Sequence, residues 1–411
     1  MPKNLIRTAA ALGLLLALPG LAAGGQALPQ VSPEEVGMSQ ALLDRATERL
    51  ERAVSEMEIA GAVGAVAREG RLAYLEAVGY QDIETRTPMD PASIFRIYSM
   101  SKTVTAVAVM MLHEEGAFEL DEPVSRYLPA FSRVRVTSSS EGPARPPSRP
   151  ITIRDLLLHT SGLSHRTDEL YREARVRSRA IPLARFVENV VDTPLMEDPG
   201  TRYRYGASPT VLGALVEVWS GKGFDEFLEE RVFRPLGMSD TGFWVEADRA
   251  HRLTTVYRAT ADGLRPHRIE EVPFTERPAL LEGAVGLVST VPDYLRFAQM
   301  LLNGGELDGI RILEAETVAT MTSNGLPDAI LEQLGGATGW GFANVNVVLD
   351  ADASPLPASV GEYSRGGSAG TMSWMDPEED LLIVIMWQNN PSNPGTVRAD
   401  FKTLVRESIL R

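Results

Sequence analysis

Segments with the two-residue alternation typical of β-strands occur near both ends of this 411-residue chain, whereas helical patterns dominate the middle. A hairpin is predicted at residues 61–79, around a turn at Glu69-Gly70. Further strands are predicted at 341–349, 368–375 and 381–388. We expect the two ends to build one sheet. The sequence therefore predicts a mixed α/β fold in which a helical region, approximately 120–300, is an insertion.

Four helical segments frame this prediction. An amphipathic helix is expected at 39–57, a buried helix at 103–112, an apolar stripe at 211–219 and a closing helix at 396–410. Residues 183–300 are mostly helical in pattern. A cleft between the sheet and the helical region would bring residues near 99, 205 and 365 together, although they are far apart in the sequence.

The first 27 residues resemble an export signal. A basic start at Lys3 and Arg7 precedes an apolar run at 8–18, and small residues follow. The run is short for a membrane span, although an uncleaved anchor is the alternative. We expect a cleaved signal peptide at 1–27 and a periplasmic or secreted domain at 35–411 that is not stably inserted in a membrane.

Composition excludes several kinds of site. The chain has no cysteine, which rules out disulfides, thiolate metal ligands and a cysteine nucleophile. A formal net charge of −15 argues against a nucleic-acid partner. The five histidines form no H-E-x-x-H pattern, so we expect neither a catalytic metal nor a cofactor. His159 is interpreted as a structural hydrogen-bonding residue.

Lysine usage points to one position. Of the 40 basic residues only four are lysines, and one of them, Lys102, follows Ser99 by three positions. Arginine cannot release its proton in a protein, whereas a buried lysine can. Ser99 and Lys102 therefore fit a nucleophile beside its proton acceptor, the S-x-x-K arrangement. The alternative is a serine helix cap followed by a solvated lysine.

Several ordered segments add a family resemblance. Ser99-Met100-Ser101-Lys102 resembles the nucleophile motif of class C β-lactamases and their relatives, the family VIII carboxylesterases and D-aminopeptidases. The further similar segments, in the family's order, are L-L-L-H-T-S-G-L at 156–163, P-G-T-R-Y-R-Y at 199–205, P-L-G-M-S-D-T at 235–241 and G-L-V-S-T at 286–290. The resemblance covers roughly residues 35–411. It implies a β-lactamase/DD-peptidase-like fold with an antiparallel sheet flanked by helices.

The resemblance also implies roles for particular residues. Ser99 would be acylated, and Lys102 and Tyr205 would share the work of general base and general acid. A tyrosine with an ordinary pKa near 10 is a poor base, and a neighbouring cation lowers that pKa. The backbone N–H groups of Ser99 and Ser368 would form the oxyanion hole. Arg365, Gly366 and Gly367 would line the substrate cleft.

Two departures from the lactamase pattern favour an esterase. Arg365-Gly366-Gly367 stands where lactamases have Lys-[TS]-Gly, and the family esterases often have Trp-Gly-Gly there. Ala207 replaces an asparagine that helps lactamases hold the substrate amide. Arg365 could still bind a substrate carboxylate. We therefore expect a carboxylesterase acting on short-chain acyl esters, with a β-lactamase or D-amino-acid peptidase, or a non-catalytic binding protein, as alternatives.

Overall fold

The computed structural model describes residues 27–137, 143–165, 168–392 and 395–410. Its main element is an eight-stranded sheet of order β10-β11-β12-β13-β14-β1-β2-β3, in which every neighbouring pair is antiparallel. The strands are β1 (Gly61–Arg68), β2 (Arg71–Asp82), β3 (Thr87–Pro88), β10 (Thr338–Trp340), β11 (Asn346–Val348), β12 (Tyr363–Gly366), β13 (Met372–Asp376) and β14 (Leu381–Met386). The predicted single antiparallel sheet from both ends of the chain is confirmed.

Helices bury both faces of this sheet. The central strand β14 shows why: Leu381, Ile383 and Ile385 point into one core and alternate with residues that point into the other. The first core lies under α1 (Gln40–Ser55) and α12 (Val397–Glu407), which contact each other. The second lies under α2 (Ser101–Glu114) and α9 (Val291–Leu302).

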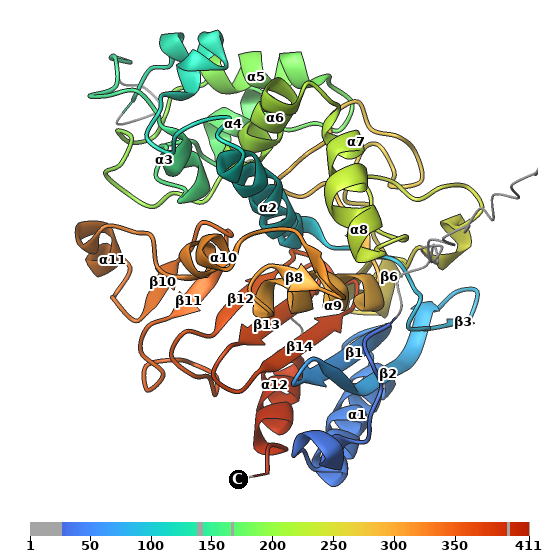
Figure 1. Ribbon diagram of the computed structural model, residues 1–411. Helices are drawn as coiled ribbons and strands as arrows, with labels where there is room; N and C mark the ends of the chain where they lie inside the picture. The colour runs from blue at the N-terminus through green and yellow to red at the C-terminus, as the bar shows by residue number, and fades with distance from the viewer. Residues whose placement is uncertain (1–26, 138–142, 166–167, 393–394, 411) are drawn as a thin grey trace, which may run out of the picture.

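The helical part of the molecule lies beyond α2 (Figure 1). Its helices are α3 (Ile153–Leu157), α4 (Glu169–Glu173), α5 (Leu183–Asp192), α6 (Ser208–Ser220), α7 (Phe224–Leu228) and α8 (Arg234–Leu236). Figure 1 shows α2 between this part and the sheet, and α2 packs on α6. A residue at the start of α2 is therefore placed at the junction of the two parts.

Short elements complete the described part of the chain. Three two-stranded ladders join β4 (Phe95–Arg96) to β7 (Val288–Ser289), β5 (Tyr257–Thr260) to β6 (Gly263–Pro266), and β8 (Glu306–Leu307) to β9 (Ile310–Arg311). The remaining helices are α10 (Ala315–Thr322) and α11 (Asp328–Gln333), five 3₁₀ turns at Pro33–Val36, Tyr98–Met100, Val124–Arg126, Pro129–Arg133 and Ala250–Arg252, and a π-helical turn at Glu229–Phe233.

Two predicted strands have different bounds. The segment predicted as one strand at 341–349 is a turn followed by β11, because Gly341 N–H bonds to the Val345 carbonyl and Asn344 has a φ of 58°. The strand predicted at 368–375 starts only at Met372. Gly367 N–H donates to the Thr371 carbonyl, which closes a tight turn before β13.

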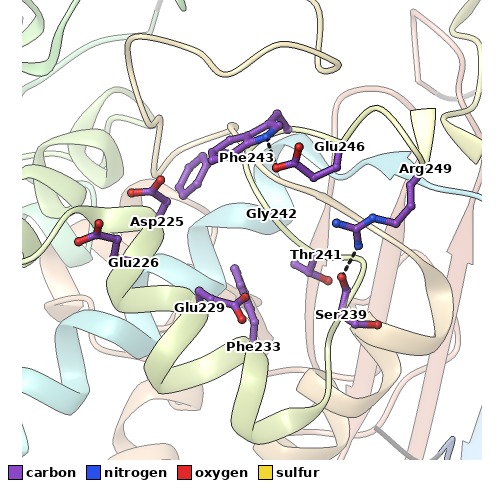
Figure 2. A pocket seen from close by; sticks show the side chains of 11 residues that line it. Asp225, Glu226, Glu229, Phe233, Ser239, Thr241, Gly242, Phe243, Glu246 and Arg249 are labelled. Atoms are coloured by element: carbon purple, nitrogen blue, oxygen red, sulfur yellow. Dashed lines mark hydrogen bonds between the residues drawn. The ribbon is translucent and has the colours of Figure 1, made fainter. Parts of the chain in front are cut away.

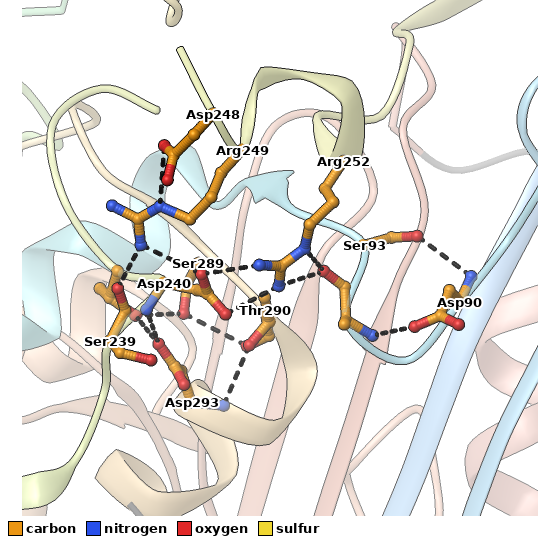
Figure 3. A network of polar contacts seen from close by, with 12 residues as sticks. Asp90, Ser93, Ser239, Asp240, Asp248, Arg249, Arg252, Ser289, Thr290 and Asp293 are labelled. Atoms are coloured by element: carbon orange, nitrogen blue, oxygen red, sulfur yellow. Dashed lines mark hydrogen bonds and ion pairs between the residues drawn. The ribbon is translucent and has the colours of Figure 1, made fainter. Parts of the chain in front are cut away.

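The helical prediction for residues 183–300 is wrong for residues 237–290, since no α-helix occurs between α8 and α9. Polar contacts hold this stretch instead (Figure 3). The Asp240 carboxylate accepts hydrogen bonds from Arg249 and Arg252, and its N–H donates to Asp293 at 2.8 Å. Burial raises the pKa of Asp293 to about 6. Side-chain partners thus replace the helical backbone bonds that the apolar pattern suggested.

The predicted signal peptide lies outside the described residues, apart from Ala27. Within the described part of the chain, no helix is long and apolar enough to cross a membrane.

Candidate active site

Ser99 stands in a strained turn that leads into α2. The preceding residue, Tyr98, has a φ of 40°, which is uncommon for a residue with a Cβ atom. This conformation occurs next to the predicted nucleophile, where strain is typically stored. Because Ser99 lies in the first turn of the helical segment, its N–H has no acceptor within that segment. The N–H is thus available to a developing negative charge.

Lys102 and Tyr205 both contact the Ser99 hydroxyl. Lys102 Nζ is 3.2 Å and Tyr205 Oη is 2.8 Å from Ser99 Oγ. Lys102 Nζ also lies 4.7 Å from the centre of the Tyr205 ring. Lys102 reaches Ser99 because it is one helical turn further along α2, whereas Tyr205 comes from the loop before α6. The structure therefore brings together the three residues predicted to be catalytic.

Their electrostatic surroundings suit proton transfer. Burial, only partly opposed by Tyr205, lowers the pKa of Lys102 to about 8. Burial by itself raises the pKa of Tyr205, but the positive charges of Arg365 and Lys102 outweigh it and lower this pKa to about 8. Loss of one proton from the pair turns one of the two donors to Ser99 Oγ into an acceptor for the hydroxyl proton.

Arg365 lies behind Tyr205. Its Nη2 donates to Tyr205 Oη, its Nε donates to the Ser99 carbonyl at 3.0 Å, and its guanidinium packs 5.2 Å from the Trp340 ring centre. Arg365 is 4 % exposed. It does not line the cavity beside Ser99, and neither do Gly366 and Gly367. This placement does not support the predicted substrate-binding role of these three residues.

Ser368 does line that cavity. Its N–H has no hydrogen-bond partner among the described residues, so it is available beside the Ser99 N–H. Gly367 makes this approach possible, because a Cβ atom there would lie 2.4 Å from the Ile97 carbonyl oxygen. The glycine run therefore lets the turn before β13 approach the segment that carries the nucleophile.

A backbone segment, residues 282–287, holds α2 in place; we name it the cradle segment. Lys102 Nζ donates to the Ala284 carbonyl at 2.6 Å, and Thr105 Oγ1 donates to the Gly283 carbonyl at 2.7 Å. Leu287 N–H donates to Ser101 Oγ at 3.1 Å. Side chains at three positions of the S-x-x-K helix are thus bound by one segment, which fixes Lys102 against Ser99.

His159 is a structural neighbour of Tyr205, in keeping with its interpretation from the sequence. Its Nδ1 accepts the Gly206 N–H at 3.2 Å, and its ring centre is 4.8 Å from that of Tyr205. Burial lowers the pKa of His159 well below the usual value, so the ring is neutral. His159 therefore orients the tyrosine loop without supplying a charge.

The cavity beside Ser99 is small and mostly apolar. Its volume is about 140 Å³. Apolar walls come from Tyr171, Val176, Phe186, Ala207 and Val285, and polar groups from Ser164, His165, Arg177 and Thr210. Burial lowers the pKa of His165 to about 4, which leaves this ring neutral at neutral pH.

A second pocket, of about 290 Å³, has a different character (Figure 2). It is lined by Asp225, Glu226, Glu229 and Glu246, together with aromatic side chains. Its polar groups have protein partners: Asp225 pairs with Arg277 at 2.8 Å, and Glu246 accepts from Trp244 at 2.8 Å. Ser99, Lys102 and Tyr205 do not line it. We assign it no catalytic role.

The sequence interpretation missed three contributors to the site. These are the Ala284 carbonyl, the Trp340 ring against Arg365, and Arg177 in the cavity wall. The first lies just before the family segment G-L-V-S-T at 286–290, which is the nearest sequence signal. A carbonyl group has no residue signature, however, and the arginine lies outside every noted motif.

Fold and site together define a serine hydrolase of the β-lactamase and penicillin-binding-protein type. The model of the Beta-lactamase family matches residues 47–406, and the chain belongs to this family. It is similar to Protein Rv1367c of Mycobacterium tuberculosis, with 35% identity over 348 residues that cover 81% of this chain and 86% of that protein.

Two further similarities concern acyl-transfer enzymes. Esterase EstB of Burkholderia gladioli is 30% identical over 361 residues, which cover 82% of this chain and 88% of the esterase. The solved structure of EstCE1, described as a hydrolase with promiscuous acyltransferase activity, has a TM-score of 0.79 and 28% identity, and covers 89% of this chain and 98% of that one. The predicted family, fold class and enzyme class are confirmed.

Proposed function

We propose that this protein is a carboxylesterase that cleaves short-chain acyl esters through an acyl-enzyme on Ser99. One observation carries the proposal: Ser99 Oγ contacts Lys102 and Tyr205 at the edge of a small, mostly apolar cavity. The acyl group enters this cavity, and its carbonyl oxygen binds the N–H groups of Ser99 and Ser368. Losing one such donor typically costs about 2.7–4 kcal/mol of transition-state stabilisation.

The chemical steps follow from the contacts. The Lys102–Tyr205 pair, after losing one proton, accepts the Ser99 proton as Oγ attacks the carbonyl carbon. The same pair then returns a proton to the leaving alcohol. A water molecule next attacks the acyl-enzyme carbonyl, the pair accepts the proton of this water, and it returns a proton to Ser99 Oγ as the acid leaves. Arg365 acts through Tyr205, because its guanidinium stabilises the phenolate.

Two features support an ester substrate over a lactam or a D-amino-acid peptide. Ala207, which lines the cavity, offers no side-chain amide to hold a substrate amide. Arg365, the cation that could bind a substrate carboxylate, is buried against Tyr205 and Ser99. Similarity to esterase EstB and to EstCE1 points the same way. An alcohol in place of water would make the same acyl-enzyme an acyltransferase.

The test compares initial rates on p-nitrophenyl butyrate and on a chromogenic cephalosporin, with Ser99→Ala as the control. The proposal expects fast, Ser99-dependent ester turnover and little lactam turnover. Comparable lactam hydrolysis would favour the β-lactamase alternative. The absence of Ser99-dependent rate on both would direct attention to D-amino-acid peptides, and then to a binding role.

We also propose that the protein is exported, on the strength of the basic and apolar pattern of residues 1–27. Cell fractionation and N-terminal sequencing of the product test this. A cytoplasmic protein that retains Met1 would contradict it.

A further inference from the structure

Arg177 occupies an unusual position in the wall of the catalytic cavity. Among the described residues that line this cavity, Lys102 and Arg177 are the lysine and the arginine, and the walls are otherwise mostly apolar. Lys102 is used by the proposed chemistry. The proposed function assigns nothing to Arg177, although Arg177 also contributes to lowering the pKa of Lys102 and of His165.

Two carboxylates hold the Arg177 guanidinium. Its Nε donates to Glu282 Oε1 at 2.5 Å, and its Nη2 donates to Glu270 Oε1 at 2.9 Å. The Glu282 side chain is 1 % exposed, and Glu282 begins the cradle segment that binds Lys102. The orientation of the guanidinium is therefore fixed before any substrate arrives, which is what a recognition group requires.

One nitrogen of this guanidinium is left over. Arg177 Nη1 has no hydrogen-bond partner among the described residues. Arg177 lines a mostly apolar cavity, and an unmatched N–H donor there favours a ligand oxygen over a hydrocarbon chain, because the donor loses its hydration when the cavity fills. Two carboxylates already contact this guanidinium, so a neutral oxygen acceptor adds no third negative charge beside them.

From these contacts we infer that Arg177 determines acyl-group specificity and selects short acyl chains that carry a neutral oxygen acceptor, a hydroxyl or keto group, over plain aliphatic chains. The inference rests on the proposed esterase function and names the substrate class of the same site. Arg177 Nη1 donates to that oxygen, while Tyr171, Val176 and Phe186 pack against the carbon chain.

The test uses the ratio of kcat/KM for the 4-nitrophenyl esters of 3-hydroxybutanoic and butanoic acid. Arg177→Lys keeps a cation beside Glu282, but its single ammonium nitrogen cannot occupy the positions of all three guanidinium nitrogens. It is expected to lower this ratio about tenfold, the effect of losing one hydrogen bond to a charged group. A KM change confined to the hydroxylated ester would mark a binding contact.

Arg179→Lys is the matched control. Arg179 is on the same segment and is buried, but it donates to the Phe243 carbonyl at 3.2 Å, packs 3.8 Å from the Phe274 ring centre and does not line the cavity. Arg179→Lys should change kcat/KM for both esters by the same factor. An equal loss on both esters in Arg177→Lys would overturn the inference, because Arg177 would then act only by holding Glu282 and the cradle segment.

A binding experiment separates this inference from the proposed function. In the Ser99→Ala protein, calorimetry compares ethyl 3-hydroxybutanoate with ethyl butanoate, with and without Arg177→Lys. Preference for the hydroxylated ester that disappears with Arg177→Lys supports the inference even if neither ester is turned over by the unmodified enzyme. Equal binding of the two esters when Arg177 is present overturns it.

Discussion

Lys102 and Lys402 are both buried, yet their surroundings differ completely. Lys402 on α12 pairs with Glu362 at 2.5 Å, and both side chains are nearly inaccessible. Lys102 on α2 has a hydroxyl, a phenol and a backbone carbonyl as neighbours, and no ion pair with a described carboxylate. Burial lowers the pKa of both lysines, but the Glu362 carboxylate partly opposes this at Lys402, and a buried lysine with such an acid partner serves the fold. One without such a partner gives its proton up more easily and serves chemistry.

The region around Lys402 shows how the fold uses charge. Beside that pair, Arg406 of the same helix binds Asp376 of β13, and Asp376 also accepts from Ser359 at 2.7 Å. These contacts tie α12 to the sheet on the face opposite α2 (Figure 1). Around Lys102 the corresponding partners are neutral, and the extra positive charge of Arg365 is directed at Tyr205.

The largest expected effect is on activity at Lys102. Ser99→Ala should reduce turnover to background, and Lys102→Arg should be nearly as damaging, a loss of about 10⁴-fold or more, because arginine keeps the charge but cannot accept a proton. Initial rates on p-nitrophenyl butyrate measure this. Lys402→Arg is the control for the substitution itself and should keep most activity. A mildly impaired Lys102→Arg would reduce Lys102 to a fixed charge.

The second effect, on stability, separates the two lysines. Lys402→Met should lower the free energy of unfolding by about 3–5 kcal/mol, because Glu362 is left buried and unpaired. Lys102→Met should lose less than about 1 kcal/mol, or gain, since it also relieves a charge buried without an acid partner. Urea denaturation at pH 7 compares them. Similar losses in both variants would contradict the distinction.

The stability cost of burying the Lys102 charge depends on pH. The pKa of Lys102 is about 8 in the folded protein, below the ordinary value of about 10.4. The cost of burying its charge is therefore fully present below pH 8 and is relieved as pH rises from 8 toward 10.4. The unmodified protein should therefore gain stability relative to Lys102→Met across that interval.

A smaller effect concerns Arg365. Activity should rise with pH through about 8, as the Lys102–Tyr205 pair loses a proton. Arg365→Gln removes the cation that lowers the Tyr205 pKa, so this limb should move to higher pH and the rate at pH 7 should fall about 10–100-fold. Arg365→Lys should restore part of the shift. If the rising part of the pH–rate profile does not move and KM rises for anionic esters, Arg365 would instead be assigned to substrate binding.

The smallest effect is expected at Lys222, the one exposed lysine in the described residues. It pairs with Glu230 on the surface, where solvent screens the charges. Lys222→Met should leave both the rate and the denaturation midpoint unchanged within error. A shift comparable to that of Lys402→Met would show that burial is not what distinguishes these lysines.

Local signals explain which elements were predicted well. The hairpin β1–β2 follows from two apolar runs around the Glu69-Gly70 turn, and α1 follows from its apolar stripe, because both patterns depend on near neighbours. Residues 239–290 were misread as helical because the Asp240–Arg252 and Arg177–Glu282 contacts that hold this stretch join residues far apart in the sequence or across a loop. Pattern reading has no access to such partners.

The fold class, the single sheet from both ends and the identities of Ser99, Lys102 and Tyr205 were predictable from the sequence, because apolar runs, turns and ordered motifs are read along the chain. Tertiary structure alone decided what surrounds them. It placed Arg365 behind Tyr205 instead of in the cavity, supplied the Ala284 carbonyl to Lys102, and set Arg177 into the wall. Burial and the pKa of a side chain depend on contacts in space, which chain order does not specify.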